Sequence, residues 1–383
     1  MKILVNTSNL KMGGAIQVGI SFINEIREER KHCFHIVLSK EISQQVNTKQ
    51  FPSNFSFYDY SVKANRVSAY QGKNKFLSQL ENAIKPDCVF SIFSPTYWKP
   101  RSLHIAGFAA GWTINPDSIA FRQLKIVDRI KKNLQNYLKL KLSITQTDIF
   151  IGETQVVRER LNKFGKFPIN KIHVVGNTFG SHFNKVINTA DFRLPIKRES
   201  DEFRFVTISA NYPHKNLKIL KSVIPILRRK KVNVKFILTL PNQEFNQIFS
   251  DFDDYIINLG PVPINACPGI YAQCDALFLP TLLESFTASY PEAMIMQKPI
   301  LTSNLDFAKD ICKDAAEYFE PLNQQDIVQK IMNLINNEKR YNELIRLGLD
   351  RVKDFPTAKK RAEKYIEICE QEVNRYHDTN HTS

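Results

Sequence analysis

The chain has 383 residues, of which 43 % are hydrophobic and 24 % are charged, as in an ordinary soluble globular protein. This length is about two to three times that of a typical single domain, so we expect two domains. No apolar run approaches the roughly 18 residues of a membrane-spanning helix, so a transmembrane segment is not expected. Residues 1–7 lack the apolar stretch of a signal peptide, and the expected location is the cytoplasm.

The charge balance favours anionic partners. The chain has 53 Lys and Arg residues against 38 Asp and Glu residues, which gives a formal net charge of +15. Nucleic acid, phosphorylated small molecules and an anionic membrane surface all fit such an excess. The six cysteines are spread along the chain without a Cys-x-x-Cys pair, so we expect reduced thiols and no zinc site.

The first half of the chain alternates short apolar runs with helix-like patterns. The predicted strands cover residues 2–6, 35–39, 55–60, 87–93, 103–109, 149–152 and 172–175. One predicted helix follows Gly13-Gly14, and another covers residues 75–84. Strands that alternate with helices indicate a parallel α/β sheet.

The second half repeats this α/β alternation. Its predicted strands cover residues 203–208, 235–240, 256–259, 276–279 and 299–302. The polar, weakly periodic residues 188–201 are the expected linker. The sequence therefore predicts one domain over 1–187 and another over 203–356. A charged helix over 357–376 is expected to pack back on the first domain, and residues 377–383 are expected to be disordered.

The most informative stretch reads YAQCDALFLPTLLESFTASYPEAMIMQKPILT and begins at Tyr271. It combines a strand, a Pro-Thr turn and two glutamates, Glu284 and Glu292, with seven residues between them. The helix after the first glutamate is expected to open with Ser285, Phe286 and Thr287. Its free amides would lie beside Glu284, where a phosphate would be stabilised.

This stretch resembles the retaining glycosyltransferases of family 4, whose nucleotide-sugar site carries two glutamates in the same spacing. The strand with Asp275, then Pro280, and the Lys298-Pro299 turn into the next strand fit the same pattern. A solvated helix face is the alternative interpretation of two glutamates alone. The resemblance implies the GT-B fold, in which two Rossmann-like domains face each other across a cleft.

The resemblance also implies a phosphate-binding loop after the first strand of the second domain. This loop reads SANYPHKN, and Lys215 falls on the family's lysine, with Asn211 and His214 beside it. A lysine there acts as a point charge on the diphosphate. The family's arginine five positions earlier is replaced by Ala210, and His214 or an arginine from elsewhere is the candidate to compensate. A solvated lysine at a helix start is the alternative.

Two further elements of the resemblance concern glycine turns. Pro261 and Val262 fall on the turn whose backbone lines the nucleobase, and an ordinary strand-ending glycine at Gly260 is the alternative interpretation. Gly14 falls on the glycine loop that approaches the donor diphosphate and the acceptor, because glycine lets backbone amides come close. His104 lies at the start of its predicted strand and is expected to be structural, not a sugar ligand.

The resemblance implies a role for each site residue. Lys215 and the amides of residues 285–287 would hold the diphosphate, Glu292 would bind the ribose hydroxyls, and Glu284 would contact the sugar near its reacting carbon. Lys215 and Glu284 are thus the expected catalytic residues. The implied reaction retains the anomeric configuration and uses no metal or cofactor. The Asp-x-Asp at Asp251 is expected to be solvated surface.

A basic amphipathic helix is predicted over residues 121–142, with seven Lys or Arg residues against one aspartate. Such a helix can lie on an anionic membrane surface, whereas packing of its apolar stripe on the domain is the alternative, and both can hold at once. With the resemblance, it suggests a saccharide or lipid-linked saccharide acceptor in bacterial polysaccharide, capsule or lipopolysaccharide synthesis. The location would then be peripheral, at the inner face of the plasma membrane.

Two rival functions are open on the sequence alone. A GT-B nucleotide-sugar epimerase shares the sheets and the nucleotide site, and product analysis without an acceptor separates it from a transferase. A basic nucleic-acid-binding protein could use the +15 charge and the 27 phenylalanines. The basic residues are spread along the chain and form no recognisable RNA module, so nucleic acid is not the expected partner.

Overall fold

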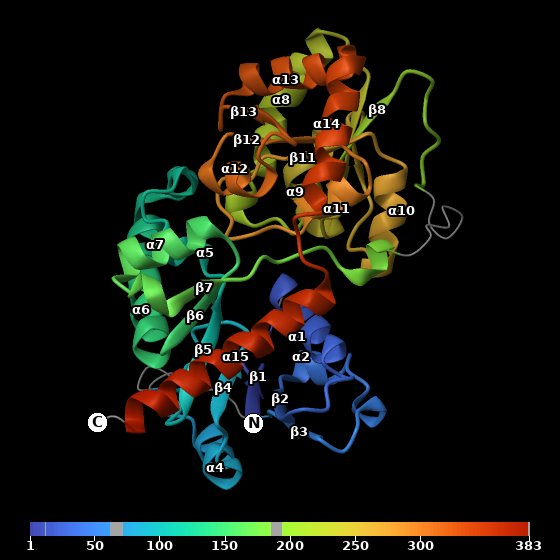
Figure 1. Cartoon of the computed structure of the whole chain (residues 1–383). Coiled ribbons are helices and arrows are strands. Elements are labelled where there is room, and N and C mark those ends of the chain that lie inside the picture. The colour runs from blue at the N-terminus through green and yellow to red at the C-terminus, as the bar shows by residue number, and fades with distance from the viewer. Residues whose placement is uncertain (12, 62–71, 185–193, 382–383) are drawn as a thin grey trace. The chain divides into compact units, whose positions relative to one another are not determined.

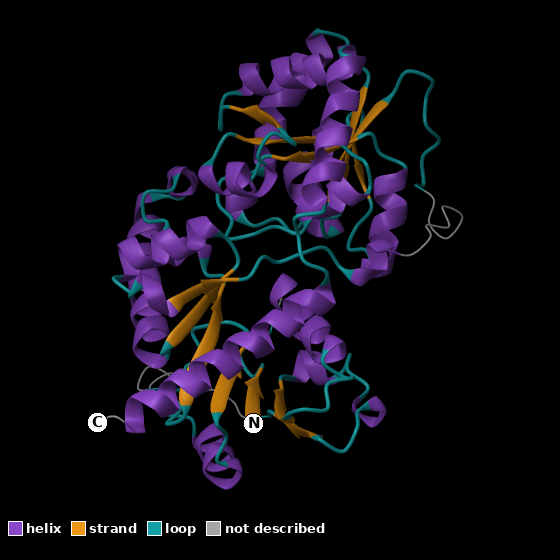
Figure 2. Cartoon of the chain, viewed as in Figure 1, coloured by secondary structure: helices purple, strands orange, loops and turns teal. Residues whose placement is uncertain are grey.

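The computed structural model describes residues 1–11, 13–61, 72–184 and 194–381 and divides into two compact units (Figure 1). Unit 1 consists of Met1–Pro116, Ile126–Asn177 and Pro356–Ser383, and unit 2 of Asp117–Lys125 and Thr178–Phe355. Figure 2 shows that each unit is a sheet with helices on its two faces, so the expected α/β class is confirmed.

The sheet of unit 1 is parallel throughout, and its strand order in the described residues is β3-β2-β1-β4-β5-β6-β7. The strands are β1 (Lys2–Asn6), β2 (Cys33–Leu38), β3 (Phe55–Asp59), β4 (Cys88–Ser91), β5 (Leu103–Phe108), β6 (Ile149–Gly152) and β7 (Ile172–Val174). They lie within two residues of the predicted strands. The central strands are continuous apolar runs because helices bury both faces of a parallel sheet.

The helices of unit 1 begin and end at recognisable signals. They are α1 (Gly14–Glu25), α2 (Lys40–Ser43), α4 (Lys75–Ile84), α5 (Gly111–Ile114), α6 (Ile126–Gln146), α7 (Gln155–Gly165) and α15 (Ala358–His381), with 3₁₀ turns η1 (Thr48–Gln50) and η3 (Ile169–Lys171). Asn74 caps α4 by accepting a hydrogen bond from the Leu77 amide at 3.1 Å. Thr154 caps α7 in the same way, through the Val157 amide at 3.2 Å.

The C-terminal helix α15 packs on unit 1, against α1. Its buried residues in the core of this unit are Ala362, Tyr365, Ile366, Ile368, Cys369 and Val373. The buried Arg361 guanidinium donates to Ser21 Oγ at 3.0 Å and also to Asn177 Oδ1. Asn177 is the last residue of unit 1 before the chain enters unit 2. The helix extends to His381, so the expected disorder of residues 377–381 is wrong. Residues 382 and 383 lie outside the described part.

The sheet of unit 2 repeats the same topology, with the strand order β10-β9-β8-β11-β12-β13 in the described residues. The strands are β8 (Phe203–Thr207), β9 (Val234–Leu238), β10 (Ile256–Asn258), β11 (Ala276–Leu279), β12 (Ile300–Ser303) and β13 (Glu317–Phe319). Successive side chains alternate between the faces, so Phe205 packs on the side of α8 and α13 while Val206 packs on the side of α10 and α11.

The helices of unit 2 fill the two layers over this sheet. They are α8 (Leu220–Arg229), α9 (Asn242–Phe249), α10 (Cys267–Ala272), α11 (Ser289–Ile295), α12 (Asp306–Cys312), α13 (Gln324–Asn336) and α14 (Glu338–Val352). The 3₁₀ turns are η2 (Ile119–Gln123), η4 (Ser181–Asn184), η5 (Pro213–Lys215), η6 (Leu217–Ile219), η7 (Ser250–Phe252) and η8 (Ile264–Ala266). Within the described residues, no helix combines the length and hydrophobicity that crossing a bilayer requires.

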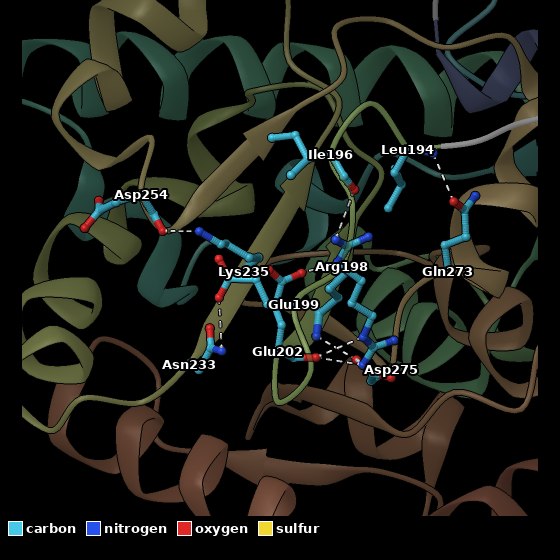
Figure 3. Close-up of polar contacts among 11 residues, drawn as sticks. Leu194, Ile196, Arg198, Glu199, Glu202, Asn233, Lys235, Asp254, Gln273 and Asp275 are labelled. Atoms are coloured by element: carbon cyan, nitrogen blue, oxygen red, sulfur yellow. Dashed lines mark hydrogen bonds and ion pairs between the residues drawn. The ribbon is translucent and has the colours of Figure 1, made fainter.

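The boundary between the units differs from the expected linker over 188–201. The chain enters unit 2 at Thr178, and the described part of the expected linker packs on that unit. Leu194 donates its amide to Gln273 Oε1 at 2.9 Å, and Arg198 forms an ion pair with Asp275 at 2.6 Å (Figure 3). A polar, weakly periodic stretch can thus belong to a folded unit when its side chains find partners there.

The predicted helix over 121–142 is also interrupted. Residues 119–123 form the 3₁₀ turn η2 in unit 2, and α6 begins only at Ile126 in unit 1. Ser118 Oγ accepts from the Ala120 amide at 3.2 Å and donates to the Leu282 carbonyl at 3.2 Å, which stabilises η2 in unit 2. A segment between two strands of the first sheet therefore contributes to the second unit.

Replacing Arg204 by Met is expected to destabilise unit 2 strongly. The Arg204 and Glu202 side chains are 3 % and 1 % exposed and form an ion pair, and Glu202 Oε2 has no further partner in the described residues. Removing the arginine leaves a buried carboxylate without a countercharge, at a cost of about 3–5 kcal/mol.

The matched control is Arg228→Met, because the ion pair of Arg228 with Asp254 joins two side chains that are each 48 % exposed. This variant is expected to lose no more than about 1 kcal/mol. Urea denaturation of the two variants measures the difference, and equal losses would contradict the assignment of Arg204 as the structural partner.

Candidate functional site

The loops that carry Lys215 and Glu284 meet at the C-terminal ends of the unit 2 strands. β8 and β11 are adjacent parallel strands, and the chain continues from β8 to β9 on one side and from β11 to β12 on the other. The connections after these two strands therefore diverge, which is where open α/β sheets bind their ligands. The connection after β8 contains η5, and the connection after β11 runs over residues 280–288.

At these strand ends Lys215 and Glu284 form an ion pair. Lys215 Nζ lies 2.6 Å from Glu284 Oε1, and their side chains are only 14 % and 10 % exposed. Thr281 Oγ1 donates to the same carboxylate oxygen at 2.8 Å. The structure thus brings together the two residues that the sequence predicts as catalytic, although they are 69 positions apart.

The backbone holds the two loops together beside this ion pair. The Leu282 amide donates to the His214 carbonyl at 2.7 Å, and Thr281 Oγ1 lies 3.2 Å from the same oxygen. Because these contacts fix the residues next to Lys215 and Glu284, the backbone of the two loops positions both charges. Thr281 is a site residue that sequence reasoning missed, although it directly follows the Pro280 that the resemblance includes.

The lysine loop is a 3₁₀ turn with an aromatic stack on its surface. The rings of Tyr212 and His214 are parallel, with centroids 5.6 Å apart and an interplanar angle of 6°. Tyr212 is 43 % exposed and Asn211 is partly buried. None of the contacts of the described residues places an arginine beside Lys215. His214, its neighbour in η5, stays the predicted substitute for the arginine that Ala210 replaces.

Ser285, Phe286 and Thr287 precede helix α11 and do not open it, because α11 begins at Ser289. The expected helix start is therefore wrong by about one turn. Ser285 and Thr287 are both 7 % exposed, and Phe286 packs near Phe355, with ring centroids 6.2 Å apart. The buried Ser285 Oγ has no hydrogen-bond partner in the described residues, and it directly follows Glu284. An anionic ligand oxygen at this position would satisfy that hydroxyl.

Glu292 lies in α11, where its side chain is partly buried. Burial raises the pKa of Glu292 to about 7, while a hydrogen bond from Tyr271 and the positive charge of Lys215 act in the opposite direction. Tyr271 Oη is 3.5 Å from Glu292 Oε2, and the tyrosine is fully buried. Lys215 therefore acts electrostatically on both predicted glutamates. The sequence pattern includes Tyr271 but does not indicate its contact with Glu292.

Pro261 and Val262 follow the edge strand β10. Gly260 before them has φ +70°, a conformation that favours glycine. Pro261 is exposed and Val262 is partly buried against the core. β10 is separated from β8 by β9, and no contact among the described residues joins this turn to Lys215 or Glu284. The assignment of this turn to a nucleobase stays a prediction.

Gly14 belongs to unit 1, whereas the other predicted site residues belong to unit 2. It opens α1 after Gly13, whose φ is +68°. Gly14 is exposed, and a Cβ atom added there would meet nothing within 4 Å. The glycine pair therefore gives α1, the first helix after β1, an exposed N-terminus.

His104 and Trp112 of unit 1 have structural contacts. His104 is fully buried in β5, where Nε2 lies 2.8 Å from Ser91 Oγ and Nδ1 contacts the Gln146 carbonyl. Burial lowers the pKa of His104, so it is held as a neutral core residue, in agreement with its expected structural role. Trp112 lies under the Lys132 ammonium, which is 5.0 Å from the indole centroid.

The Asp-x-Asp at Asp251 lies in and just after the 3₁₀ turn η7, where both aspartates are exposed. In the described ranges, no three or more His, Cys, Asp or Glu side chains gather as a metal site would require.

Replacing Glu292 by Gln is expected to stabilise the protein at high pH. Because the folded pKa of about 7 exceeds the ordinary 4.5, the folded state holds this proton more tightly than the unfolded chain. The contribution of Glu292 is thus most favourable below pH 4.5 and is lost as the pH rises through about 7. At pH 8 the Gln variant should gain about 1–3 kcal/mol, and at pH 5 much less.

Denaturant unfolding at the two pH values measures this difference. The control is Glu363→Gln, which changes an exposed glutamate of α15. A gain for Glu292→Gln that is the same at both pH values would contradict the raised pKa.

Comparisons with known proteins give a family match, a relative and several solved structures of similar fold. Residues 202–337 match the family model of the glycosyl transferases group 1. The chain is 23 % identical over 229 residues to the O-antigen chain mannosyltransferase RfbU of Salmonella typhimurium, a match that covers 56 % of this chain. The matched region spans only 60 % of that relative's length.

Solved glycosyltransferases resemble the chain over nearly its whole length. HepE of Anabaena, in complex with UDP and glucose, aligns with a TM-score of 0.70 at 14 % identity and covers 96 % of this chain and 98 % of its own. A glycosyltransferase of Rickettsia africae gives 0.68 at 14 % identity, covering 97 % and 98 %. WaaG, a glycosyltransferase of lipopolysaccharide biosynthesis, gives 0.68 at 12 % identity, covering 95 % and 98 %. The fold of this chain is therefore the GT-B fold, and its second unit carries the segment that matches the group 1 glycosyltransferase model.

Proposed function

We propose that this chain is a retaining glycosyltransferase that moves a sugar from a nucleotide-diphosphate sugar to a saccharide or lipid-linked saccharide. The observation that carries the proposal is the Lys215–Glu284 ion pair. It lies where the connections after β8 and β11 diverge, within the segment matched by the group 1 model. At this place the ammonium can stabilise the negative charge of the leaving group, and the carboxylate can contact the sugar of the same donor.

The donor would lie along the edge that these loops form. Lys215 and the amides of residues 285–287 bind the diphosphate, and the unpartnered Ser285 hydroxyl gains a ligand oxygen. Glu292 accepts hydrogen bonds from the ribose hydroxyls. Asn211 and His214 border the donor from the lysine loop, and the backbone of residues 261–262 borders its nucleobase. The complex of HepE with UDP and glucose supports a nucleotide sugar as the donor.

Glu284 would have one role in the donor-free protein and another when the donor is bound. Without a donor, its carboxylate keeps the Lys215 ammonium in place at 2.6 Å. When the diphosphate binds, the ammonium turns to the phosphate oxygens, and the carboxylate faces the sugar carbon on which positive charge develops. Because both charges are largely shielded from water, their effect on the transition state exceeds that of exposed charges.

The transfer step exchanges one bond for another at the anomeric carbon. The bond from this carbon to the diphosphate oxygen breaks, and a bond to the acceptor oxygen forms on the same face. The proton of the acceptor hydroxyl passes to the departing diphosphate oxygen. Lys215 neutralises part of the charge that leaves with the nucleoside diphosphate, which is why we propose a mechanism without metal or cofactor.

The names of the similar proteins support a role in bacterial cell-surface polysaccharide synthesis. One acts on O-antigen chains and another in lipopolysaccharide biosynthesis. We therefore extend the proposal to a growing saccharide, free or lipid-linked, as the acceptor. The active site would then work in the cytoplasm, near the inner face of the plasma membrane.

One nucleotide sugar is expected to raise the melting temperature of the protein, because a ligand that binds only the folded state stabilises it. The measurement is a thermal-shift panel of UDP-, GDP-, ADP- and CDP-sugars. Lys215→Ala and Glu292→Ala should lose the shift. Lys218→Ala removes an exposed lysine three positions away and should keep it. Equal shifts in all three variants would place the nucleotide elsewhere.

Glu284→Gln is expected to lower kcat by roughly 100-fold or more while the donor still binds, because the amide keeps the shape but loses the charge. Turnover is measured as release of nucleoside diphosphate with an accepted saccharide. NMR of the wild-type product should show the anomeric configuration of the donor. An inverted product would contradict the retaining mechanism, and conversion of the nucleotide sugar without acceptor would favour an epimerase.

A further inference from the structure

Helix α6 exposes large apolar side chains to solvent. The exposed residues are Ile126 (79 %), Val127 (76 %), Ile130 (66 %), Leu134 (60 %) and Tyr137 (62 %). They occupy successive turns over the first half of the helix. Most other large exposed apolar residues of the described chain stand singly, so this concentration is unusual for a surface helix.

These five side chains share one face. With about 100° of rotation per residue, they fall within a sector of about 100° around the helix axis. The side that packs on unit 1 is a different one and carries Asn136, Leu140 and Ser143. Asn136 Nδ2 donates to the Trp112 carbonyl at 3.1 Å, which fixes this side against α5. The apolar stripe of α6 therefore points away from its own domain. The alternative from the sequence, in which this stripe packs on the domain, is wrong for these five residues.

Cations surround the apolar stripe. The exposed basic residues in and just before α6 are Arg122, Lys125, Arg129, Lys131, Lys139 and Lys141. None of them takes part in an ion pair among the described residues, and Asp128 is the single acidic residue between them. Lys132 differs, because its ammonium lies on Trp112 and burial lowers its pKa.

The apolar stripe and the cations around it together favour one kind of partner. A second copy of this face would bring two sets of cations together, which opposes self-association. Nucleic acid would meet the cations but leave four aliphatic side chains without a binding site. An anionic bilayer accommodates both, since acyl chains receive the apolar residues and phosphate groups receive the cations.

We propose that unit 1 docks on an anionic lipid bilayer through α6, with Ile130, Leu134 and Tyr137 inserted among the lipids and Lys131 and Lys141 on the headgroups. This surface makes the proposed lipid-linked acceptor accessible. Docking itself needs neither donor nor turnover, so a failure to bind lipid and a failure of the transferase assay are separate results.

Tyr137→Trp combined with Trp112→Phe provides a reporter for insertion, because position 137 is 62 % exposed. The remaining native Trp98 is fully buried, and the partly buried Trp112, which lies beside α6, no longer contributes emission. Vesicles of phosphatidylcholine with phosphatidylglycerol should shift the new emission to shorter wavelength and protect it from an aqueous quencher. Vesicles of phosphatidylcholine alone should give a much smaller effect. No change of the emission with either vesicle would overturn the proposal.

Two sets of variants test the stripe and the charges in vesicle sedimentation. Ile130→Ser with Leu134→Ser should weaken binding at least about tenfold, because the buried apolar area is lost. Lys131→Glu with Lys141→Glu should weaken it by at least about tenfold at low salt and less at high salt.

Matched controls in unit 1 are Ile169→Ser, a 44 % exposed isoleucine, and Lys359→Glu with Lys360→Glu on α15. These variants should bind vesicles like the wild type. Equal losses in tests and controls would overturn docking through α6. A lipid-free dimer that the Ile130→Ser, Leu134→Ser variant converts to a monomer would also overturn it, since the stripe would then be an interface between copies.

Discussion

The adjacency of β8 and β11 is the constraint on which the candidate site depends. Parallel strands place their C-terminal ends at one edge, and the divergence of the chain on the two sides leaves that edge open. Lys215 and Glu284 each follow one of these strands, so the sheet itself brings their charges to 2.6 Å. Contacts between Thr281, Leu282 and His214 then hold the loops together. The sheet topology thus brings the two loops together, and a few side-chain and backbone contacts fix their positions.

One cation serves two carboxyl groups in this arrangement. Lys215 pairs directly with Glu284 and acts at longer range on Glu292, whose pKa burial raises to about 7. Burial makes the ionised form of Glu292 less favourable, and the positive charge of Lys215 offsets only part of this cost. Hydroxyl groups from a ribose would relieve more of it at Glu292, and a diphosphate would supply the negative charge that Lys215 otherwise finds at Glu284.

The sequence predicts the strands well and singles out the two glutamates, because both inferences depend on local patterns. Buried parallel strands are apolar runs, and Glu284 and Glu292 lie on one continuous segment. Contacts between residues far apart in the sequence cannot be predicted from such local patterns. Periodicity reveals the apolar stripe of α6 but not which side of the helix meets the domain, since that depends on Asn136 and Trp112. The break at η2 depends on a contact with Leu282, 164 positions from Ser118.

The most direct measurement is the structure of the protein in complex with the nucleotide sugar that binds it. The account predicts that a diphosphate oxygen lies within hydrogen-bonding distance of Lys215 Nζ, that Ser285 Oγ gains a ligand partner, and that the ribose hydroxyls contact Glu292. Glu284 would then face the sugar. A nucleotide bound away from these loops, with the Lys215–Glu284 ion pair intact, would contradict it.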